Sequence, residues 1–386
     1  MRILVSGGGT GGHIYPALAV ATQLHQEYQA EILYLGSDDG LEAELAPAAG
    51  FPFAIVKAGK LQRYVSWRTL TGVARVPVGI AQAVGIVRRF RPRAAFTSGG
   101  YVAVPAGIAA RVNGVPLLMH QQDVPVNLSN RLIAPLATRI SVAFPDSLAS
   151  FPARKVLQLG NPLRQAILDV RATAPEQARG TLGLDPRLPL LLVTGGSQGA
   201  RHLNQVVCQA LPQLLAHAQV LQISGKKLFE ETRVQAEGAM ADLDEATRGR
   251  YRLVPYMDAE MPLALQAADL VLCRAGAATL SELAALGKAS LLVPLPPAIG
   301  GSPQEINAAM FERHGAAQVI RDANLKQDVL VDRALTILAN AALLHSIEQA
   351  TGALAKLNAT REIAAAVIKI AGMKTAKEPE NEGVLI

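Results

Sequence analysis

Short, continuously apolar runs recur along the chain, and each one ends in Gly, Ser or Asn before a helical pattern begins. In the first half these runs read ILVSG, EILYLGS, AAFTSGG, PLLMHQQ, ISVAF and VLQLGNP. Strands that are apolar throughout, rather than in alternation, are typical of parallel sheets covered by helices on both faces. The pattern therefore predicts an α/β fold built on parallel sheets.

The same pattern restarts after Gly160, with the runs LPLLLVTGG, AQVLQISG, YRLVPYMD, ADLVLCRAG, ASLLVPLP and AAQVIRD. A length of 386 residues also suits two domains better than one. We therefore expect two doubly wound, Rossmann-like domains, residues 1–161 and 162–347, facing a central cleft at the carboxyl ends of their strands. A helix at 348–372 is expected to return to the first domain, and the polar residues 373–386 are expected to be disordered.

The cysteine content and the hydropathy of the sequence indicate the cellular compartment of the protein. The two cysteines, Cys208 and Cys273, lie in apolar stretches and cannot form a disulfide framework, which favours a reducing compartment. The N-terminal residues enter an apolar strand directly, without the basic and long apolar regions of a secretory signal. No run reaches the roughly 18 apolar residues that a spanning helix needs. These observations predict a cytoplasmic protein that does not cross a bilayer.

The basic charge is concentrated in one region. The net charge is only +6, but between Leu45 and Gln122 the chain has ten Lys or Arg residues and no Asp or Glu. Apolar side chains are interleaved with them, and this composition suits a phospholipid leaflet, a nucleic acid or an anionic lipid substrate. A nucleic acid is disfavoured because the region has few aromatic residues and no binding motif. A solvated basic face without a partner is the alternative.

A glycine-rich loop follows the first apolar run. The loop from Gly7 to Gly12 satisfies the G-x-G-x-x-G pattern and Asp38 follows the second run, so a dinucleotide-binding dehydrogenase is one interpretation. Two features argue against it, because His13 follows the last glycine directly and a second loop of the same kind, TGGSQGAR at 194–201, opens the second half. Backbone amides at helix N-termini bind anionic groups in general. Two such loops facing one cleft can hold two substrates.

His13 is a candidate general base, since it lies at the end of the first loop, where a hydroxyl nucleophile can be held. A neutral imidazole accepts a proton near pH 7. A helix-capping or packing role is the alternative for this side chain.

A second constellation lies in CRAGAATLSE, residues 273–282. Gly276 breaks the chain after an apolar run, and a helix that begins with small residues follows. If Ala277 to Thr279 form its first turn, their amides point toward a diphosphate, while the Glu282 carboxylate accepts the two hydroxyls of a ribose. Charge compensation at the helix start, or a capping box between Glu282 and Thr279, is the alternative.

Taken together, these motifs closely resemble the MurG family of peptidoglycan glycosyltransferases, glycosyltransferase family 28, over about residues 1–370. The resemblance is carried, in colinear order, by GGGTGGHIYPALAVA, TSGGYVAVPAGIAA, GNPLR, GGSQGARHLN, ADLVLCRAGAATLSELAALGKASLLVPLP and QEINA. It implies a GT-B fold with an acceptor-binding N-terminal domain and a donor-binding C-terminal domain. It also implies inverting transfer of N-acetylglucosamine from UDP-GlcNAc to the 4-hydroxyl of undecaprenyl-diphospho-MurNAc-pentapeptide, lipid I to lipid II, without metal or cofactor.

The resemblance also assigns site residues. It places the donor UDP-GlcNAc at Thr10, Gly11, Gly12, Asp123, Arg164, Ser197, Met257, Ala277, Ala278, Thr279, Leu280, Ser281, Glu282 and Gln304. In this assignment the Met257 backbone reads uracil, Gln304 contacts the sugar hydroxyls, and Arg164 with the loop amides replaces a metal at the diphosphate. It places the acceptor near Gly99, Gly100, Tyr101 and Gln121, with simple packing as the alternative for the Tyr101 ring.

Two departures from the family pattern affect the chemistry. The family's H-E-Q-N is HQQD at 120–123, so the glutamate is Gln121 and the donor-contacting asparagine is Asp123. Because a glutamine accepts no proton at this pH, the general base is expected to be His13 or Asp123. The histidine that usually precedes Gln304 is Pro303, which weakens the expected contacts with the donor sugar.

A membrane-tethered acceptor gives the basic region a role. An enzyme without a spanning helix must meet lipid I at the leaflet, on the cytoplasmic face of the plasma (inner) membrane, as a peripheral protein. The expected docking residues are Leu61, Tyr64, Trp67, Arg68, Arg75, Arg88, Arg89 and Arg91. Cell-wall synthesis proteins are further candidate partners, and the expected role extends to cell shape and division.

Two other classes of function stay open. One is a related GT-B enzyme, such as a lipid galactosyltransferase or a sugar-nucleotide epimerase. The other is a non-enzymatic or NAD-binding module whose glycine loop only happens to match.

Overall fold

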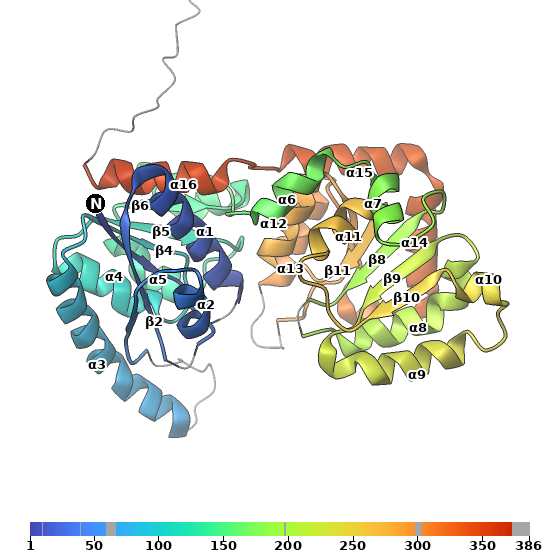
Figure 1. Cartoon of the computed structure of the whole chain (residues 1–386), viewed down its shortest axis with the longest axis horizontal. Coiled ribbons are helices and arrows are strands. Elements are labelled where there is room, and N and C mark those ends of the chain that lie inside the picture. The colour runs from blue at the N-terminus through green and yellow to red at the C-terminus, as the bar shows by residue number, and fades with distance from the viewer. Residues whose placement is uncertain (10, 39, 59–66, 197, 298–302, 373–386) are drawn as a thin grey trace, which may run out of the picture. The chain divides into compact units, whose positions relative to one another are not determined.

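The computed structural model describes residues 1–9, 11–38, 40–58, 67–196, 198–297 and 303–372, and for 67–76 the backbone alone. The chain divides into two compact units (Figure 1). The first comprises Met1–Gln122, Val126–Pro162 and the chain from Asn358 onward, and the second comprises Asp123–Pro125 and Leu163–Leu357. Each unit is built on one parallel sheet, so the predicted α/β fold is confirmed.

The sheet of the first unit has seven strands in the order β3-β2-β1-β4-β5-β6-β7, and every pairing is parallel. Its strands are β1 (Arg2–Ser6), β2 (Glu31–Gly36), β3 (Phe53–Ile55), β4 (Ala94–Thr97), β5 (Leu117–Gln121), β6 (Arg139–Val142) and β7 (Val156–Gln158). The apolar runs predicted six of them. The edge strand β3 was missed because it has only three residues, too few for a recognisable run.

The sheet of the second unit has six strands in the order β10-β9-β8-β11-β12-β13, again all parallel. They are β8 (Leu190–Thr194), β9 (Gln219–Ile223), β10 (Tyr251–Val254), β11 (Leu270–Cys273), β12 (Ala289–Leu292) and β13 (Gln318–Val319). Each strand falls within one of the predicted apolar runs. The two sheets therefore share one doubly wound strand order, with an additional strand in the first.

Helices cover both faces of the first sheet. They are α1 (Gly11–Tyr28), α2 (Glu42–Ala48), α3 (Trp67–Phe90), α4 (Ala103–Val112), α5 (Leu128–Ile133) and α16 (Ala359–Ile370), with the 3-10 turns η1 (Ala134–Leu136) and η2 (Pro145–Ser150). Ile3 and Val5 of β1 pack into one apolar cluster and Leu4 into the other, as the alternation of a strand requires. This two-sided burial explains why residues 3–5 of β1 are all apolar.

The second unit is covered in the same way. Its helices are α6 (Gln165–Asp169), α7 (Pro175–Thr181), α8 (Arg201–Leu215), α9 (Phe229–Ala239), α10 (Glu245–Arg248), α11 (Met261–Ala267), α12 (Ala277–Leu286), α13 (Gln304–Arg313), α14 (Gln327–Ala339) and α15 (Ala341–Ala353), with the 3-10 turns η3 (Val170–Ala172), η4 (Lys226–Leu228) and η5 (Asp322–Asn324). Within the described part of the chain, no single helix is long and apolar enough to cross a membrane. Among the described helices, α14 and α15 taken together reach that length and composition, with a bend of 91° between them.

The expectation of one helix over 348–372 is wrong in detail. Helix α15 ends at Ala353 and stays in the second unit, where the buried Thr351 hydroxyl lies 2.7 Å from the Ala316 carbonyl oxygen. Helix α16 then begins at Ala359 and packs against α1 in the first unit (Figure 1). Its buried residues Ile363 and Val367 complete the core on that face of the first sheet.

Each sheet reverses its strand order at one point, between β1 and β4 in the first unit and between β8 and β11 in the second. Ligands of doubly wound sheets bind at such points, beyond the carboxyl ends of the strands. The four loops that leave these strands begin at Gly7, Ser98, Gly195 and Arg274. All four contain or adjoin residues that the sequence analysis assigned to a site.

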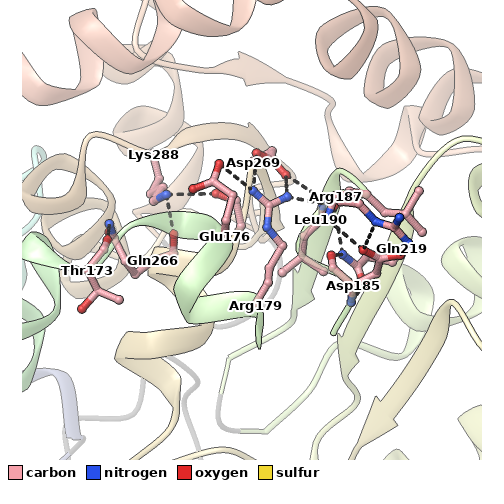
Figure 2. A network of polar contacts seen from close by, with 12 residues as sticks. Thr173, Glu176, Arg179, Asp185, Arg187, Leu190, Gln219, Gln266, Asp269 and Lys288 are labelled. Carbon is pink, nitrogen blue, oxygen red and sulfur yellow. Dashed lines mark hydrogen bonds and ion pairs between the residues drawn. The ribbon is translucent and has the colours of Figure 1, made fainter. Parts of the chain in front are cut away.

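A buried polar network joins the amino ends of β8 and β11, at the opposite edge of the second sheet (Figure 2). Arg179 on α7 donates to Oδ2 of Asp269 at 2.7 Å and to the Leu188 carbonyl at 2.8 Å. Asp269 also accepts a bond of 2.7 Å from the Leu190 amide. Lys288 is buried and donates to two further carbonyls, and its burial lowers its pKa. These charges hold the sheet together at the edge away from the predicted site.

We expect Arg179→Ala to lower the free energy of unfolding of the second unit by about 3 kcal/mol, because it leaves the Asp269 carboxylate without its buried partner. Hydrogen exchange of β8 and β11 peptides in increasing urea measures this loss. The control is Arg187→Ala, which breaks an ion pair of a side chain that is 89% exposed. It is expected to have little or no effect, and equal losses in the two variants would contradict the structural role of Arg179.

Candidate functional site

The turns after β1 and β4 touch each other through backbone atoms. Gly100 has a φ of +85°, and a Cβ at this position would lie 2.1 Å from the Gly8 carbonyl oxygen. Only glycine combines this left-handed conformation with so close an approach. The sequence therefore folds the two predicted loops of the first unit into one site.

His13 lies on the first turn of α1 and is held from the second loop. Its Nδ1 lies 2.9 Å from the Ser98 carbonyl oxygen, and Nε2 of Gln122 donates to the same oxygen at 3.0 Å. Nε2 of Gln122 also lies 3.2 Å from Nδ1 of His13. Because a carbonyl oxygen only accepts and an amide nitrogen only donates, Nδ1 bonds to Ser98 when it carries a proton and to Gln122 when it does not. In the tautomer with the proton on Nδ1, the lone pair of the neutral ring, and with it the basicity, is on Nε2. This tautomer suits a general base that acts through Nε2.

Behind His13, a buried amide network occupies the end of β5. Asn130 on α5 donates to Oε1 of Gln121 at 2.7 Å and to the His120 carbonyl at 3.0 Å. The His120 ring bonds Ser141 and Asn161, and burial lowers its pKa to about 4. His120 is therefore neutral at physiological pH and supports the site without changing its charge.

Tyr101 supports the first loop with its ring. A Cβ on Gly9 would lie 2.7 Å from Cε1 of Tyr101, so the ring packs directly against the loop backbone. The Tyr101 hydroxyl lies 2.6 Å from Oγ of Ser37, at the end of β2. The packing interpretation of this ring is thus present in the structure, beside any contact with a ligand.

The second unit repeats the glycine design after β8. Gly199 has a φ of +74°, and a Cβ there would lie 2.0 Å from the Ser224 carbonyl oxygen, so the turn requires glycine. The Thr194 hydroxyl accepts from the Gly196 amide at 3.2 Å, just as the Thr97 hydroxyl accepts from Gly99 in the first unit. Each loop thus has a threonine at the end of the preceding strand whose hydroxyl accepts from a loop amide.

Helix α12 begins at Ala277 with Gly276 as its N-cap and no side-chain cap. The alternative prediction of a capping box between Glu282 and Thr279 is therefore wrong. The first backbone amides of the helix have no intrahelical acceptor. Glu282 instead accepts from Nε and Nη2 of Arg164, both at 2.9 Å and both on Oε1. Burial raises the pKa of Glu282, and the charge of Arg164 opposes that rise. Two predicted donor-binding residues thus pair with each other.

Asn307 on α13 gathers a second cluster in the same unit. The Nδ2 of its side chain donates to Oδ1 of Asp123 at 2.9 Å and to the Ala275 carbonyl at 3.1 Å. The Oδ1 of the same side chain accepts from the Val124 backbone amide at 2.9 Å. Gln304, one turn earlier, accepts a bond from the Leu295 amide at 2.9 Å. Asp123 therefore already serves as an acceptor for a buried amide.

Other predicted site residues are distributed as follows. Gly11 and Gly12 open α1, Ala278, Leu280 and Ser281 lie in the first two turns of α12, and buried Met257 follows β10. Thr10, Ser197, Leu61 and Tyr64 lie outside the described residues, as do 373–386. Trp67, Arg68 and Arg75 belong to α3, but their side chains are also outside the description.

Comparison with known proteins identifies the family. Residues 3–142 match the family model of the glycosyltransferase family 28 N-terminal domain, and residues 190–366 match that of the C-terminal domain. The chain belongs to glycosyltransferase family 28. It is thus a glycosyltransferase, and the predicted resemblance is confirmed.

Relatives match this family 28 glycosyltransferase over nearly its full length. A protein of Desulforudis audaxviator, named UDP-N-acetylglucosamine–N-acetylmuramyl-(pentapeptide) pyrophosphoryl-undecaprenol N-acetylglucosamine transferase, is 38% identical over 97% of this chain and 100% of its own. The crystal structure of Acinetobacter baumannii MurG matches 95% of this chain and 99% of its own, with a TM-score of 0.76 and 27% identity. A UDP-GlcNAc 2-epimerase from Neisseria meningitidis covers 96% and 100% with a TM-score of 0.68, but at 12% identity it shares the fold alone.

Several residues that contact the predicted site residues were missed from the sequence. Gln122 and Ser98 orient His13, and Asn307 binds Asp123, yet each acts through contacts with distant parts of the chain. The signal for Gln122 was its place in HQQD, between the two departures from the family pattern. Over the residues with described positions, no group of three or more His, Cys, Asp or Glu side chains converges as a metal site would require.

Proposed function

We propose that this glycosyltransferase moves N-acetylglucosamine from UDP-GlcNAc to the 4-hydroxyl of the muramoyl sugar in undecaprenyl-diphospho-MurNAc-pentapeptide. The observation that carries the proposal is the full-length match to relatives named for this reaction, at 38% identity in one case. The hydroxyl attacks the anomeric carbon in line, opposite the leaving UDP, so the configuration inverts. The reaction belongs to peptidoglycan synthesis.

His13 is the proposed general base. The bond from Nδ1 to the Ser98 carbonyl supports this role, because a proton on Nδ1 leaves the lone pair on Nε2 to accept another. Asp123, the other candidate, already accepts a bond from Asn307 through Oδ1. We therefore assign Asp123 a positioning role in donor binding rather than proton transfer.

The donor is proposed to bind at the start of α12. The first-turn amides of Ala277, Ala278 and Thr279 meet the diphosphate, and Arg164 adds a positive charge there. Nε and Nη2 of Arg164 both bond to Oε1 of Glu282, which leaves Oε2 of Glu282 for the ribose hydroxyls. The charge that develops on the leaving UDP is thereby neutralised by amides and a guanidinium, and no metal is invoked.

The acceptor is proposed to bind at the joined loops of the first unit. Gly99, Gly100 and the helix start at Gly11 and Gly12 form its polar surface, next to His13. Gln121 takes no proton, and its bond from Asn130 supports a role in holding this surface in shape.

Docking on an anionic leaflet is proposed for the end of α3. Arg88, Arg89 and Arg91 are exposed there, and an apolar groove of about 340 Å³ is bordered by Arg2 and Arg89. Basic side chains around an apolar surface favour the interface of an anionic membrane. The protein would then act at the cytoplasmic face of the plasma membrane, where its lipid acceptor is held.

The remaining alternatives are less well supported. The likeness to an epimerase is one of fold alone. A dinucleotide module would use the Gly9 amide for its pyrophosphate, but this amide donates to the buried carboxylate of Glu42 at 3.1 Å.

The first test is release of UDP from UDP-GlcNAc in the presence of a lipid I analogue. We expect release to depend on the analogue, to continue in a chelator, and to fall sharply when UDP-galactose replaces the donor. His13→Ala is expected to lower kcat by about 10²- to 10⁴-fold, because the proton of the nucleophile loses its acceptor.

Asp123→Asn is the matched variant in the same assay, and it is expected to lower kcat by less than tenfold. A large loss for Asp123→Asn with a small loss for His13→Ala would reverse the assignment of the base. Release of no UDP by the wild type would refute the proposed reaction.

The raised pKa of Glu282 predicts a pH dependence of donor binding. As pH falls below neutrality, the Glu282 carboxyl protonates at a higher pH than an ordinary glutamate and loses its charge and part of its acceptor capacity, so the affinity for UDP-GlcNAc falls. In Glu282→Gln the affinity is expected to be about tenfold lower at pH 7 and nearly flat with pH. Calorimetry measures both, with a 2′-deoxy donor as the control ligand. A wild-type pH profile in the variant would contradict the role of Glu282.

If the end of α3 docks on an anionic membrane, replacing Arg88, Arg89 and Arg91 with Glu is expected to weaken binding to anionic vesicles by at least a hundredfold at low salt. The reason is that each basic residue contributes about 1 kcal/mol near the surface. Sedimentation with phosphatidylglycerol vesicles measures this. The control reverses three exposed arginines of the second unit, Arg187, Arg201 and Arg333, for the same change in net charge. Equal losses of vesicle binding in both variants would show that only the net charge matters, and would contradict docking through the end of α3.

A further inference from the structure

Glu42 is a completely buried carboxylate beneath the first glycine loop, and the reaction proposed above does not use it. It is the first residue of α2 and has an exposed fraction of 0%. Burial of a carboxylate is costly unless hydrogen bonds compensate for the lost water. A buried carboxylate at the edge of a ligand site therefore requires a physical reason.

Its hydrogen bonds go to the loop and to the end of β2. Oε2 accepts from the Gly9 amide at 3.1 Å, and Oε1 accepts from the Ser37 amide at 3.2 Å and from Oγ of Ser37 at 2.8 Å. All three partners donate, which matches the acceptor-only chemistry of a carboxylate. The side chain thus joins two loops that leave neighbouring strands.

Three glycines provide the space that the carboxylate fills. A Cβ on Gly40 would lie 2.1 Å from Oε2, one on Gly8 would lie 2.3 Å from Oε1, and one on Gly36 would lie 2.6 Å from Cγ of Glu42. Contacts this short do not occur between real side chains. This observation is independent of the hydrogen bonds, and it indicates that the three glycines leave the room in which this side chain is buried.

The chain of bonds continues to Tyr101. Because the Ser37 hydroxyl has one proton and donates it to Glu42, its oxygen accepts from the Tyr101 hydroxyl at 2.6 Å. The ring of Tyr101 packs against Gly9, whose amide is bound to the same carboxylate. Glu42 therefore fixes Gly9 directly and Tyr101 through Ser37.

We propose that Glu42 is a positioning residue that holds the glycine loop and Tyr101 in the arrangement that receives the lipid acceptor. The inference rests on the proposed function for the identity of that acceptor. Preorganised loop amides lower the cost of ordering on binding. The carboxylate acts from behind the loop and touches neither substrate.

The test is Glu42→Gln, which keeps the size of the side chain but replaces one acceptor oxygen with a donor. Either Gly9 or Ser37 then loses its partner. We expect the KM for a lipid I analogue to rise about tenfold while the KM for UDP-GlcNAc is unchanged. Hydrogen-exchange mass spectrometry is expected to show faster exchange in peptides covering residues 6–13. Ser37→Ala, which removes only the link to Tyr101, is a milder second variant, and its acceptor KM is expected to rise less.

The control for simple destabilisation is Asp269→Asn, a carboxylate-to-amide change in the buried network of the second unit. It is expected to lower Tm without changing either KM or the exchange of 6–13. If Glu42→Gln behaves like this control, its role is structural and the inference is overturned. If the wild type shows no transfer but Glu42→Gln still speeds exchange of the loop, the proposed function fails while the positioning of the loop stands.

Discussion

When parallel strands are buried on both faces, polar groups can gather only at the two edges of the sheet that the amino ends and the carboxyl ends of its strands form. In this chain these two edges have opposite characters. At the amino edge of the second sheet, Arg179 pairs with Asp269. Arg179, Asp269 and Lys288 each also bond to nearby backbone groups, those of Leu188, Leu190 and Gln266. At the carboxyl edges, glycine turns bring backbone atoms together and leave amides and small side chains at the surface. The charges that stabilise the second sheet and the loops proposed to bind ligands therefore lie at different edges, so the proposed site can change without loosening the core.

The glycine turns also determine which side chains can act. Where the Gly100 backbone meets Gly8, no side chain fits between the loops, and nearby in the second loop the Ser98 carbonyl contacts His13. The position of the His13 ring thus depends on a contact with the backbone, which changes little with the surroundings. Such fixed dipoles and protons are the form in which a protein site favours a transition state without reorganising at the moment of reaction.

Much of the fold could be predicted from the sequence, because its strands are apolar runs and apolarity is a local property. What failed was either too short, as with β3, or set by a tertiary contact, as with the break that separates α15 from α16. In the site, the glycine loops were identified, but the partners that orient them were not. Gln122 and His13 lie 109 positions apart, and Asp123 and Asn307 lie 184 apart. Sequence periodicity carries no information about such pairs, and Glu42 resembles any charged residue that begins a surface helix.

The pairing of Arg164 with Glu282 shows how a site for an anion can be kept in order before the anion arrives. The carboxylate is partly buried, and burial alone would favour its neutral form. The guanidinium opposes that tendency and holds Oε1 at the start of α12, beside amides that have no acceptor of their own. In the proposed donor complex, a diphosphate bound at those amides competes for the guanidinium and offsets part of the cost of weakening the ion pair, while the ribose hydroxyls donate to the carboxylate in its place. Because each polar group exchanges one partner for another, the site avoids both an unpaired buried charge and a large reorganisation.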